Sequence, residues 1–333
     1  MHYIGMDVHA KVTMVCILNS DGKVVKEQVV RGPLTEVVAA VRRAPRPFGV
    51  CYEASCGYGW LHDQLKRLAR QVVVAHPGKV RLIFNAKRKT DRIDARKLAT
   101  LLFLDQVPRV HVPAVECRQW RALIEYRHRL VARRTAVKNM IRALVRSQGL
   151  KSPRALWGSK GRGWLLDQAL AEPDGMRREM QLDELDQLGR RLRRLERELD
   201  RMGQAHPGVE LVQTIPGVGP RTAEAVVAYI DDPDRFGRNK AVGCYFGLVP
   251  CEDTSVRRRL GHITGEGPAT VRRLVVEACW QGIRRDAGLR AYFERIRAGK
   301  DDRKKIALVA TAHHLLRVML AMLRTGEVWR AAA

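Results

Sequence analysis

The first 110 residues carry a succession of short apolar segments whose order restricts the possible folds. Three segments rich in β-branched residues, YIGMDV, VTMVCIL and KVVKEQVV, follow one another closely, and Ser20-Asp21-Gly22 is typical of a hairpin turn. Two more strand-like segments, FGVCYE and QVVVAH, alternate with helical patterns over about residues 34–43 and 58–70. A meander followed by α/β units predicts one mixed sheet with helices packed against it.

This order of elements is that of the RNase H-like fold, with a further helix after the last strand. A chain of 333 residues is long enough for two or three domains. We therefore predict a fold of class α/β plus α. It comprises an RNase H-like domain at 1–112, a long basic helix and coiled-coil segment at 113–206, and a mostly α-helical domain at 207–333.

Two long helical patterns occupy the middle of the chain. The first runs from about residue 116 to 148, and a stretch rich in Gly and Pro at 151–175, predicted to be irregular, separates it from the second. The second pattern has heptad spacing, which predicts a coiled coil, although an ordinary helical hairpin within the chain fits the same spacing. Its apolar seam consists of Leu182, Leu185, Leu188, Leu192, Leu195, Leu199 and Met202.

The last domain begins with TIPGVGPRTAEAVVAYI, a pattern typical of a helix-hairpin-helix element. In such an element Gly217 and Gly219 let backbone amides approach a phosphate, with the start of the next helix behind them. A Gly-Pro turn between two packed helices is the alternative interpretation.

The charge of the chain indicates a polyanionic partner. Lys and Arg number 61 against 35 Asp and Glu, a formal net charge of +26, which favours nucleic acid. His313, His314 and Arg317 interrupt the longest apolar run, which predicts a core helix and no association with a membrane. The N-terminus lacks a signal-peptide pattern, and the seven cysteines are scattered without zinc-ligand spacing. We therefore expect a cytoplasmic, nucleoid-associated protein.

One face of the first long helix is strongly basic. Basic residues recur there every four positions, and the segment from 127 to 146 contains no acidic residue. An ordinary solvated helix face would mix the two signs, so we predict contacts with a nucleic-acid backbone. We call Arg134, Lys138, Arg142 and Arg146 the basic stripe.

Four acidic residues stand where the predicted topology can bring them together. Asp7 ends the first strand, Glu53 ends the fourth, and Asp91 and Asp94 share one face of the helix after the last strand. Carboxylates that close repel one another unless a cation joins them. Hard oxygen ligands suit Mg²⁺, with Mn²⁺ as a possible substitute, and two such ions can clamp a phosphodiester. The sequence thus predicts a metal-dependent site for phosphodiester chemistry.

Several motifs together resemble one transposase family. GMDV, YEASCGY around Glu53, and KTDRIDARKLA around the aspartate pair resemble the DEDD signature of insertion-sequence transposases of the one-hundred-and-ten family, also called bridge-RNA-guided recombinases. The resemblance continues through TIPGVGPRTA, YFGLVP and RRRLGHITGEGPATVRRLVVEA, so it covers essentially the whole chain.

The resemblance implies more than the residues alone indicate. It implies a RuvC-like N-terminal domain, a coiled-coil middle and a C-terminal transposase domain with a catalytic serine, which corresponds to Ser255 in GLVPCEDTSV. That serine would form a transient 5′-phosphoserine bond, while a structured bridge RNA pairs with donor and target DNA on a homo-oligomer, a dimer or a tetramer. Beyond the basic stripe, the expected nucleic-acid contacts are Lys89, Gly217, Gly219, Arg257, Arg258 and Arg259.

Two other functions fit part of the same sequence. A RuvC-like, metal-dependent endonuclease that resolves junctions would use the four carboxylates with water as the nucleophile, and Ser255 would be idle. A non-catalytic nucleic-acid-binding protein would use only the basic stripe and the helix-hairpin-helix element. Strand cleavage separates the enzymes from the binding protein, and a protein–DNA adduct separates the two enzymes.

Overall fold

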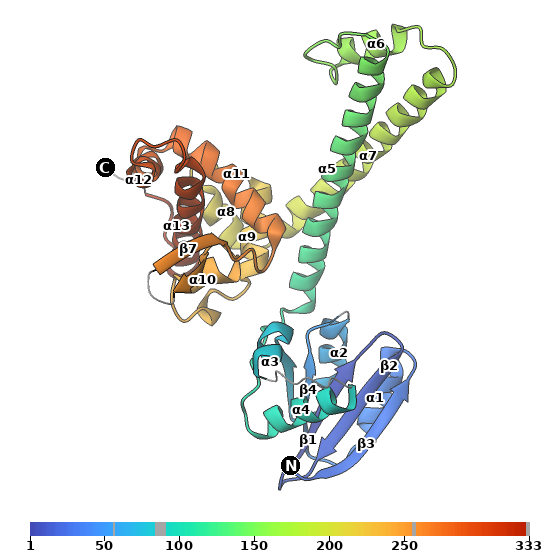
Figure 1. Ribbon diagram of the computed structural model, residues 1–333, viewed down its shortest axis with the longest axis vertical. Coiled ribbons are helices and arrows are strands. Elements are labelled where there is room, and N and C mark those ends of the chain that lie inside the picture. Colours follow the sequence, from blue (N-terminus) through green and yellow to red (C-terminus); the bar gives the residue numbers. More distant parts are fainter. Residues whose placement is uncertain (56, 84–90, 255–257, 331–333) are drawn as a thin grey trace. The chain divides into compact units, whose positions relative to one another are not determined.

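The computed structural model describes residues 1–55, 57–83, 91–254 and 258–330 (Figure 1). The chain divides into two compact units, Met1–Arg118 and Gln119–Ala333. The second unit contains both the expected helical middle and the expected C-terminal helical domain, so the finer division at residue 206 remains a prediction.

The first unit is built on one five-stranded sheet, as predicted. Its strand order is β3-β2-β1-β4-β5, in which β1 is antiparallel to β2 and parallel to β4, and β4 is parallel to β5. This mixed sheet agrees with the RNase H-like order of elements read from the sequence. The strands are β1 (His2–Val8), β2 (Val12–Leu18), β3 (Val24–Arg31), β4 (Phe48–Glu53) and β5 (Gln71–Ala75).

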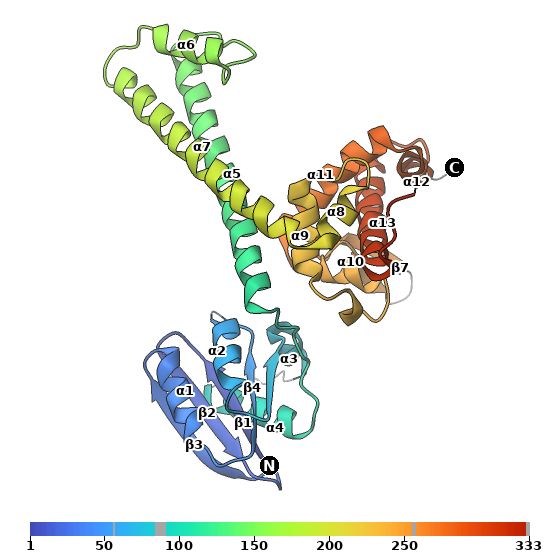
Figure 2. The same ribbon diagram turned by 180° about the vertical axis from the view of Figure 1, so that it is seen from behind.

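Helices cover both faces of this sheet. The helix α4 (Asp91–Phe103) packs on one face, while α1 (Leu34–Arg42) and α2 (Tyr58–Leu65) pack on the other, and a short α3 (Pro77–Ile83) follows β5 (Figures 1 and 2). The approach of α4 to β1 is very close, because a Cβ on Gly5 would lie 2.1 Å from the carbonyl oxygen of Ala95. A side chain at position 5 would therefore push α4 off the sheet.

The long helices form a hairpin within the chain. The helix α5 (Val115–Ser147) begins in the first unit, α6 (Ser159–Asp167) lies at the far end of the hairpin, and α7 (Asp174–Gln204) returns beside α5 (Figure 1). The six leucines of the heptad seam are at most 8% exposed and share a core with Leu130, Val137 and Ile141 of α5. The seam therefore packs inside one chain, which is the helical-hairpin alternative. Sequence reasoning missed α6, because its segment is rich in glycine.

The C-terminal part is mostly helical, as predicted, with one addition. A two-stranded antiparallel sheet interrupts the helices, and it was not predicted because PCEDT and RRLGHI lack an alternation of apolar residues. The elements are α8 (Pro207–Gln213), α9 (Pro220–Ile230), the 3-10 turn η1 (Pro233–Arg235), α10 (Ala241–Tyr245), β6 (Pro250–Thr254), β7 (Arg258–Ile263), α11 (Ala269–Arg285), α12 (Ala287–Arg297) and α13 (Lys304–Thr325).

The helix α13 lies in the core of this part. By length and composition alone it could cross a membrane, but half of its apolar window is buried inside the fold. Its fully buried residues include Leu315, Leu316 and Met319, and α8, α10, α11 and α12 contact it. This packing is that of a core helix, as the interrupted apolar run predicts.

Candidate active site

The first two acidic residues of the predicted site lie at one edge of the sheet. The strands β1 and β4 are adjacent and parallel, and the last pair in their register is Met6 with Tyr52. Asp7 and Glu53 directly follow these residues, so both stand at the carboxyl end of their strand. The sequence-based expectation that Asp7 and Glu53 share an edge agrees with this register.

Both carboxylates also belong to the sheet face that α4 covers. Side chains alternate along a strand, so Asp7 shares a face with Gly5, and Glu53 shares one with Cys51. Gly5 faces the backbone of α4, and Cys51 packs with Leu98 and Leu102 of the same helix. The first turn of α4, which carries Asp91 and Asp94, thus belongs to the same side of the sheet as the two strand ends.

Two of the basic residues that flank the aspartate pair in the sequence contact an acidic residue on β3 instead. Arg92 Nε lies 2.5 Å from Glu27 Oε2 on β3, and Arg96 Nε lies 3.4 Å from Glu27 Oε1. The hydrogen bond from Arg92 lowers the pKa of Glu27. These contacts fasten α4 to the sheet and leave its acidic face turned toward Asp7. Asp94 itself is paired locally, with Lys97 Nζ at 3.2 Å.

The structure places His9 between two of the carboxylates. His9 Nε2 lies 3.3 Å from Asp7 Oδ2 and 3.9 Å from Asp91 Oδ1. One possible ligand atom from each of the three residues lies within 4.8 Å of the others, a spacing that could hold a metal ion. Sequence reasoning missed His9, and the only local signal was its position two residues after Asp7.

The electrostatics of Asp7 match a site that needs a cation. Burial raises the pKa of Asp7, and the negative charges of Asp91 and Asp94 raise it further, while His9 lowers it. A raised pKa means that the ionised carboxylate is disfavoured there. A divalent cation would reverse that penalty, and oxygen ligands of this kind fit Mg²⁺ or Mn²⁺.

The other predicted site residues fall into three groups: some lie near Asp7, some lie outside the described residues, and some have only their backbone described. Asp94 is close enough to affect the pKa of Asp7, and Glu53 shares its sheet edge, but neither belongs to the tight group of three. Lys89, Ser255 and Arg257 lie outside the described residues. The backbone of Arg258 and Arg259 belongs to β7, where they pair with Thr254 and Asp253 of β6.

The basic stripe runs along α5 and meets an aromatic ring near its end. Lys138 Nζ lies 5.0 Å and Arg142 Cζ 5.4 Å from the centre of the Trp157 ring, a cation–π arrangement. Within the part of the chain that the structure describes, no residue of the stripe forms an ion pair with an acid. By contrast, Arg127 and Arg133 upstream pair with Glu196 and Glu184 of α7.

Like charges are concentrated along this stripe. The pKa of Lys138 is lowered by burial and then by the positive charges of Arg134 and Arg142. Such an uncompensated row of cations suits a polyanion.

The two glycines of the TIPGVGP turn have different surroundings. Gly217 has a φ of +92°, and a Cβ there would lie 2.5 Å from the backbone nitrogen of Gly282 on α11. Gly217 is thus required by helix packing, as the Gly-Pro turn alternative predicts. Gly219 precedes α9, and a Cβ there would meet no described atom within 4 Å. Of the two, Gly219 has the open surroundings that a phosphate contact needs.

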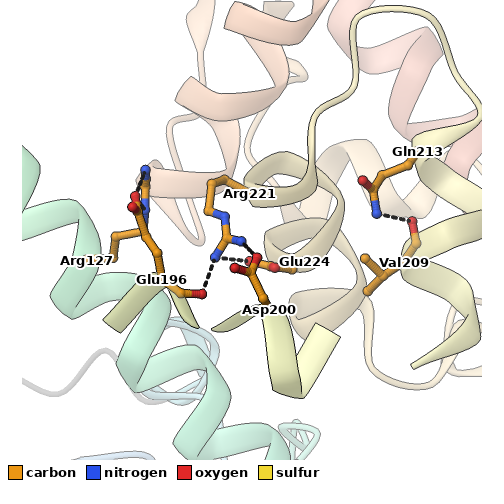
Figure 3. A network of polar contacts seen from close by, with 7 residues as sticks. All are labelled: Arg127, Glu196, Asp200, Val209, Gln213, Arg221 and Glu224. Atoms are coloured by element: carbon orange, nitrogen blue, oxygen red, sulfur yellow. Dashed lines mark hydrogen bonds and ion pairs between the residues drawn. The ribbon is translucent and has the colours of Figure 1, made fainter. Parts of the chain in front are cut away.

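A charged network joins α9 to the long helices, and Figure 3 shows it from close by. Arg221 pairs with Asp200 and lies 3.2 Å from Glu224 Oε2, while Arg127 Nε donates to Glu196 Oε1 at 2.8 Å. Glu224 is 2% exposed, and burial raises its pKa to about 7. This network ties the start of α9 to the α5–α7 hairpin.

Comparison with known families covers both halves of the chain. A model of DEDD transposases of the IS110 group matches residues 4–148, and one described as the IS116/IS110/IS902 transposase family matches residues 209–294. We call the sheet edge that carries Asp7 and Glu53 the carboxylate edge. Together with this edge of an RNase H-like sheet, the two matches define the chain as a DEDD transposase, an enzyme that acts on DNA. Such enzymes use divalent metal ions. The chain belongs to the IS110 family of insertion-sequence transposases.

Named relatives extend over most of the chain. It is 27% identical to the "Transposase for insertion sequence element IS1111A" of Coxiella burnetii, across 99% of this chain and 92% of the relative. It is 28% identical to the "Probable family 20 transposase" of Pseudomonas aeruginosa, across 73% and 74%. It is 23% identical to the "Putative transposase y4pF/y4sB" of Sinorhizobium fredii, across 99% and 86%.

Proposed function

We propose that Asp7, Glu53, Asp91 and Asp94 hold Mg²⁺, or Mn²⁺ in its place, and that Ser255 is the nucleophile of a DNA recombinase. The observation that carries the metal site is the meeting of Asp7 and Asp91 around His9, at the edge that Glu53 shares. The raised pKa of Asp7 supports the same assignment, because burial and neighbouring acids there disfavour an ionised carboxylate without a cation.

The proposed reaction exchanges one phosphoester bond for another, so the number of phosphoester bonds does not change. Ser255 loses its hydroxyl proton as Oγ attacks the scissile phosphorus, an Oγ–P bond forms, the P–O3′ bond breaks, and the departing 3′ oxygen takes up a proton. A 3′ hydroxyl on another strand then attacks the phosphoserine, a new P–O3′ bond forms, the Oγ–P bond breaks, and Ser255 Oγ takes back a proton, so strands are rejoined without net hydrolysis. Bound metal would polarise the phosphate and stabilise the charge that develops on it. The assignment of Ser255 rests on its place after the YFGLVP motif.

Guidance by a structured RNA is the third part of the proposal. The basic stripe offers a row of cations that form no ion pair among the described residues, and such a row suits the backbone of a folded RNA. In this arrangement base pairing with donor and target DNA selects sequence, while the protein contacts backbone and shape, as in other RNA-guided systems.

One experiment tests the nucleophile. DNA cleavage is stalled in the presence of Mg²⁺ and RNA, and the protein is digested and examined by mass spectrometry. We expect a nucleotide adduct on the peptide that contains Cys251 to Val256, and no adduct with Ser255→Ala, which should still bind DNA. Asp91→Ala should bind DNA but neither cleave nor form the adduct. If Ser255→Ala still cut DNA and left two free ends, water would be the nucleophile and the resolvase-like function would hold.

A further inference from the structure

A groove lies on the face of the sheet opposite α4, between α1 and α2. It has a volume of about 410 Å³, and its wall includes Thr35, Arg42, Arg43, Trp60 and Gln64. Neither the carboxylate edge nor the basic stripe contributes a residue to it. The helices α1 and α2 bury Val37, Val41, Leu61 and Leu65 against the sheet, which leaves their other faces to form the groove.

The groove combines an accessible aromatic ring with two exposed arginines. Trp60 is 42% exposed, an unusual position for an indole without a partner to cover it. The side chains of Arg42 and Arg43 are exposed and form no ion pair within the part of the chain that the structure describes. The nearby Arg118 differs, because Asp63 of α2 neutralises it.

This set of groups matches the parts of an unpaired nucleotide. An indole face stacks on any base, and guanidinium groups bind phosphate oxygens in a planar, two-pronged manner. The hydroxyl of Thr35 and the amide of Gln64 can bond to a sugar or a base edge. The volume lies within the range of about 300–1,000 Å³ typical of small-ligand sites. It therefore suits one or two unstacked nucleotides.

The position of the groove decides between the possible strands. A DNA strand that is cut must reach Asp7 and Asp91, which lie on the α4 side of the sheet. The groove lies on the other side, between α1 and α2, the helices that cover the face opposite α4 (Figure 2). We propose that the groove between α1 and α2 holds an unpaired nucleotide of single-stranded RNA, stacked on Trp60 with its phosphate on Arg42 and Arg43. This assignment rests on the RNA guidance proposed above.

Photocrosslinking of the full-length protein tests this site. The probe is a short single-stranded oligouridine RNA that carries 5-iodouridine, with the same sequence in DNA and a duplex DNA as competitors. We expect a crosslink on the peptide that contains Trp60. We also expect Trp60→Ala to weaken RNA binding by about 5- to 150-fold, the usual effect of losing one base–aromatic stack. Trp60→Phe should keep most of the affinity, because it keeps a ring for stacking.

Matched variants distinguish a contribution of the groove to RNA binding from the effect of the protein's total positive charge. Arg42→Gln with Arg43→Gln should weaken RNA binding more than Arg67→Gln with Arg70→Gln, which removes the same charge outside the groove. Equal losses in the two pairs, or an unchanged Trp60→Ala, would overturn the site while leaving RNA guidance intact. Equal competition by the DNA oligonucleotide would overturn its assignment to RNA. A wild-type protein that forms the Ser255 adduct but binds no RNA would refute the guidance and the site together.

Discussion

At the scale of single residues, the environment of Asp7 would link folding to the metal binding proposed above. Burial and two neighbouring aspartates raise its pKa, so the folded protein holds the Asp7 proton more tightly than the unfolded chain does. The contribution of Asp7 to stability is therefore greatest at low pH and is lost as the pH rises through the folded pKa. Where the side chain is ionised it opposes folding, and a bound cation would offset that effect.

The variant Asp7→Asn tests this balance. The amide carries no charge, so the metal-free variant should unfold at the same or a higher temperature than the metal-free wild type at neutral pH. Addition of Mg²⁺ or Mn²⁺ should raise the Tm of the wild type and not that of the variant. Thermal unfolding with and without metal measures both effects, and an equal metal-induced rise in the two proteins would exclude Asp7 as a ligand.

Glu224 gives a second pH-dependent prediction in the other unit. Its pKa is raised to about 7 by burial, from 4.5 in the unfolded chain, so stability should fall as the pH rises through that interval. Glu224→Gln removes the titration, and its unfolding temperature should depend less on pH between 5 and 7. Thermal unfolding across this range compares the two slopes. Parallel curves would show that Arg221 keeps Glu224 ionised throughout.

At the scale of elements, the contact between α4 and β1 determines where the aspartate pair lies. Gly5→Ala would place a Cβ 2.1 Å from the backbone of Ala95 and force α4 away from the sheet. Overpacking of this kind usually costs about 1–3 kcal/mol or more, and here it should also abolish cleavage. Gly49→Ala on the adjacent strand is the control, because its Cβ would lie 3.5 Å from the Leu102 side chain. Chemical denaturation measures the loss of stability in each variant, and cleavage assays measure the loss of activity. Equal losses in Gly5→Ala and Gly49→Ala would contradict the close contact between α4 and β1.

The basic stripe on α5 is tested by replacing all four of its residues together. Replacing Arg134, Lys138, Arg142 and Arg146 with Gln should weaken RNA binding and reduce the slope of log affinity against log salt by about three units, if each contacts one phosphate of a single strand. Arg127→Gln with Arg133→Gln is the control, because those cations already pair with Glu196 and Glu184. Binding titrations at several salt concentrations supply the slopes. An unchanged slope in the fourfold variant would make the stripe an ordinary exposed face.

The sequence predicted the elements whose signal is local. The five strands and the aspartate helix were recognisable because β-branched runs and helical periodicity fall in a familiar order, and that order placed Asp7 and Glu53 at one edge. The role of His9 depends on how β1 and α4 meet, and the pairing of Glu27 with Arg92 depends on the register of β3. The spacing of residues in the sequence predicts neither of these two contacts. Heptad spacing could not reveal that the leucine seam packs on α5 of the same chain.

At the scale of the whole molecule, the buried seam changes how assembly is expected to occur. The leucines of α7 are covered by α5, so chains cannot pair through that seam without opening the hairpin. Any oligomer must use other surfaces. Recombination still requires several strand cuts held together, and Ser255 follows Asp91 by 164 residues, in the part of the sequence that belongs to the other unit. We therefore expect the carboxylates of one chain to act with the serine of another.

Complementation between two inactive variants tests this arrangement. Ser255→Ala keeps the carboxylates and Asp91→Ala keeps the serine, so neither protein alone should cleave DNA. If each site is composed of two chains, a mixture of the two variants should recover cleavage, and the adduct should appear only on the Asp91→Ala chain, which a mass tag can identify. If each site lies within one chain, every site in the mixture lacks one essential group and no cleavage returns. The double variant Asp91→Ala/Ser255→Ala mixed with either single variant is the control, because it cannot complete a site in any arrangement.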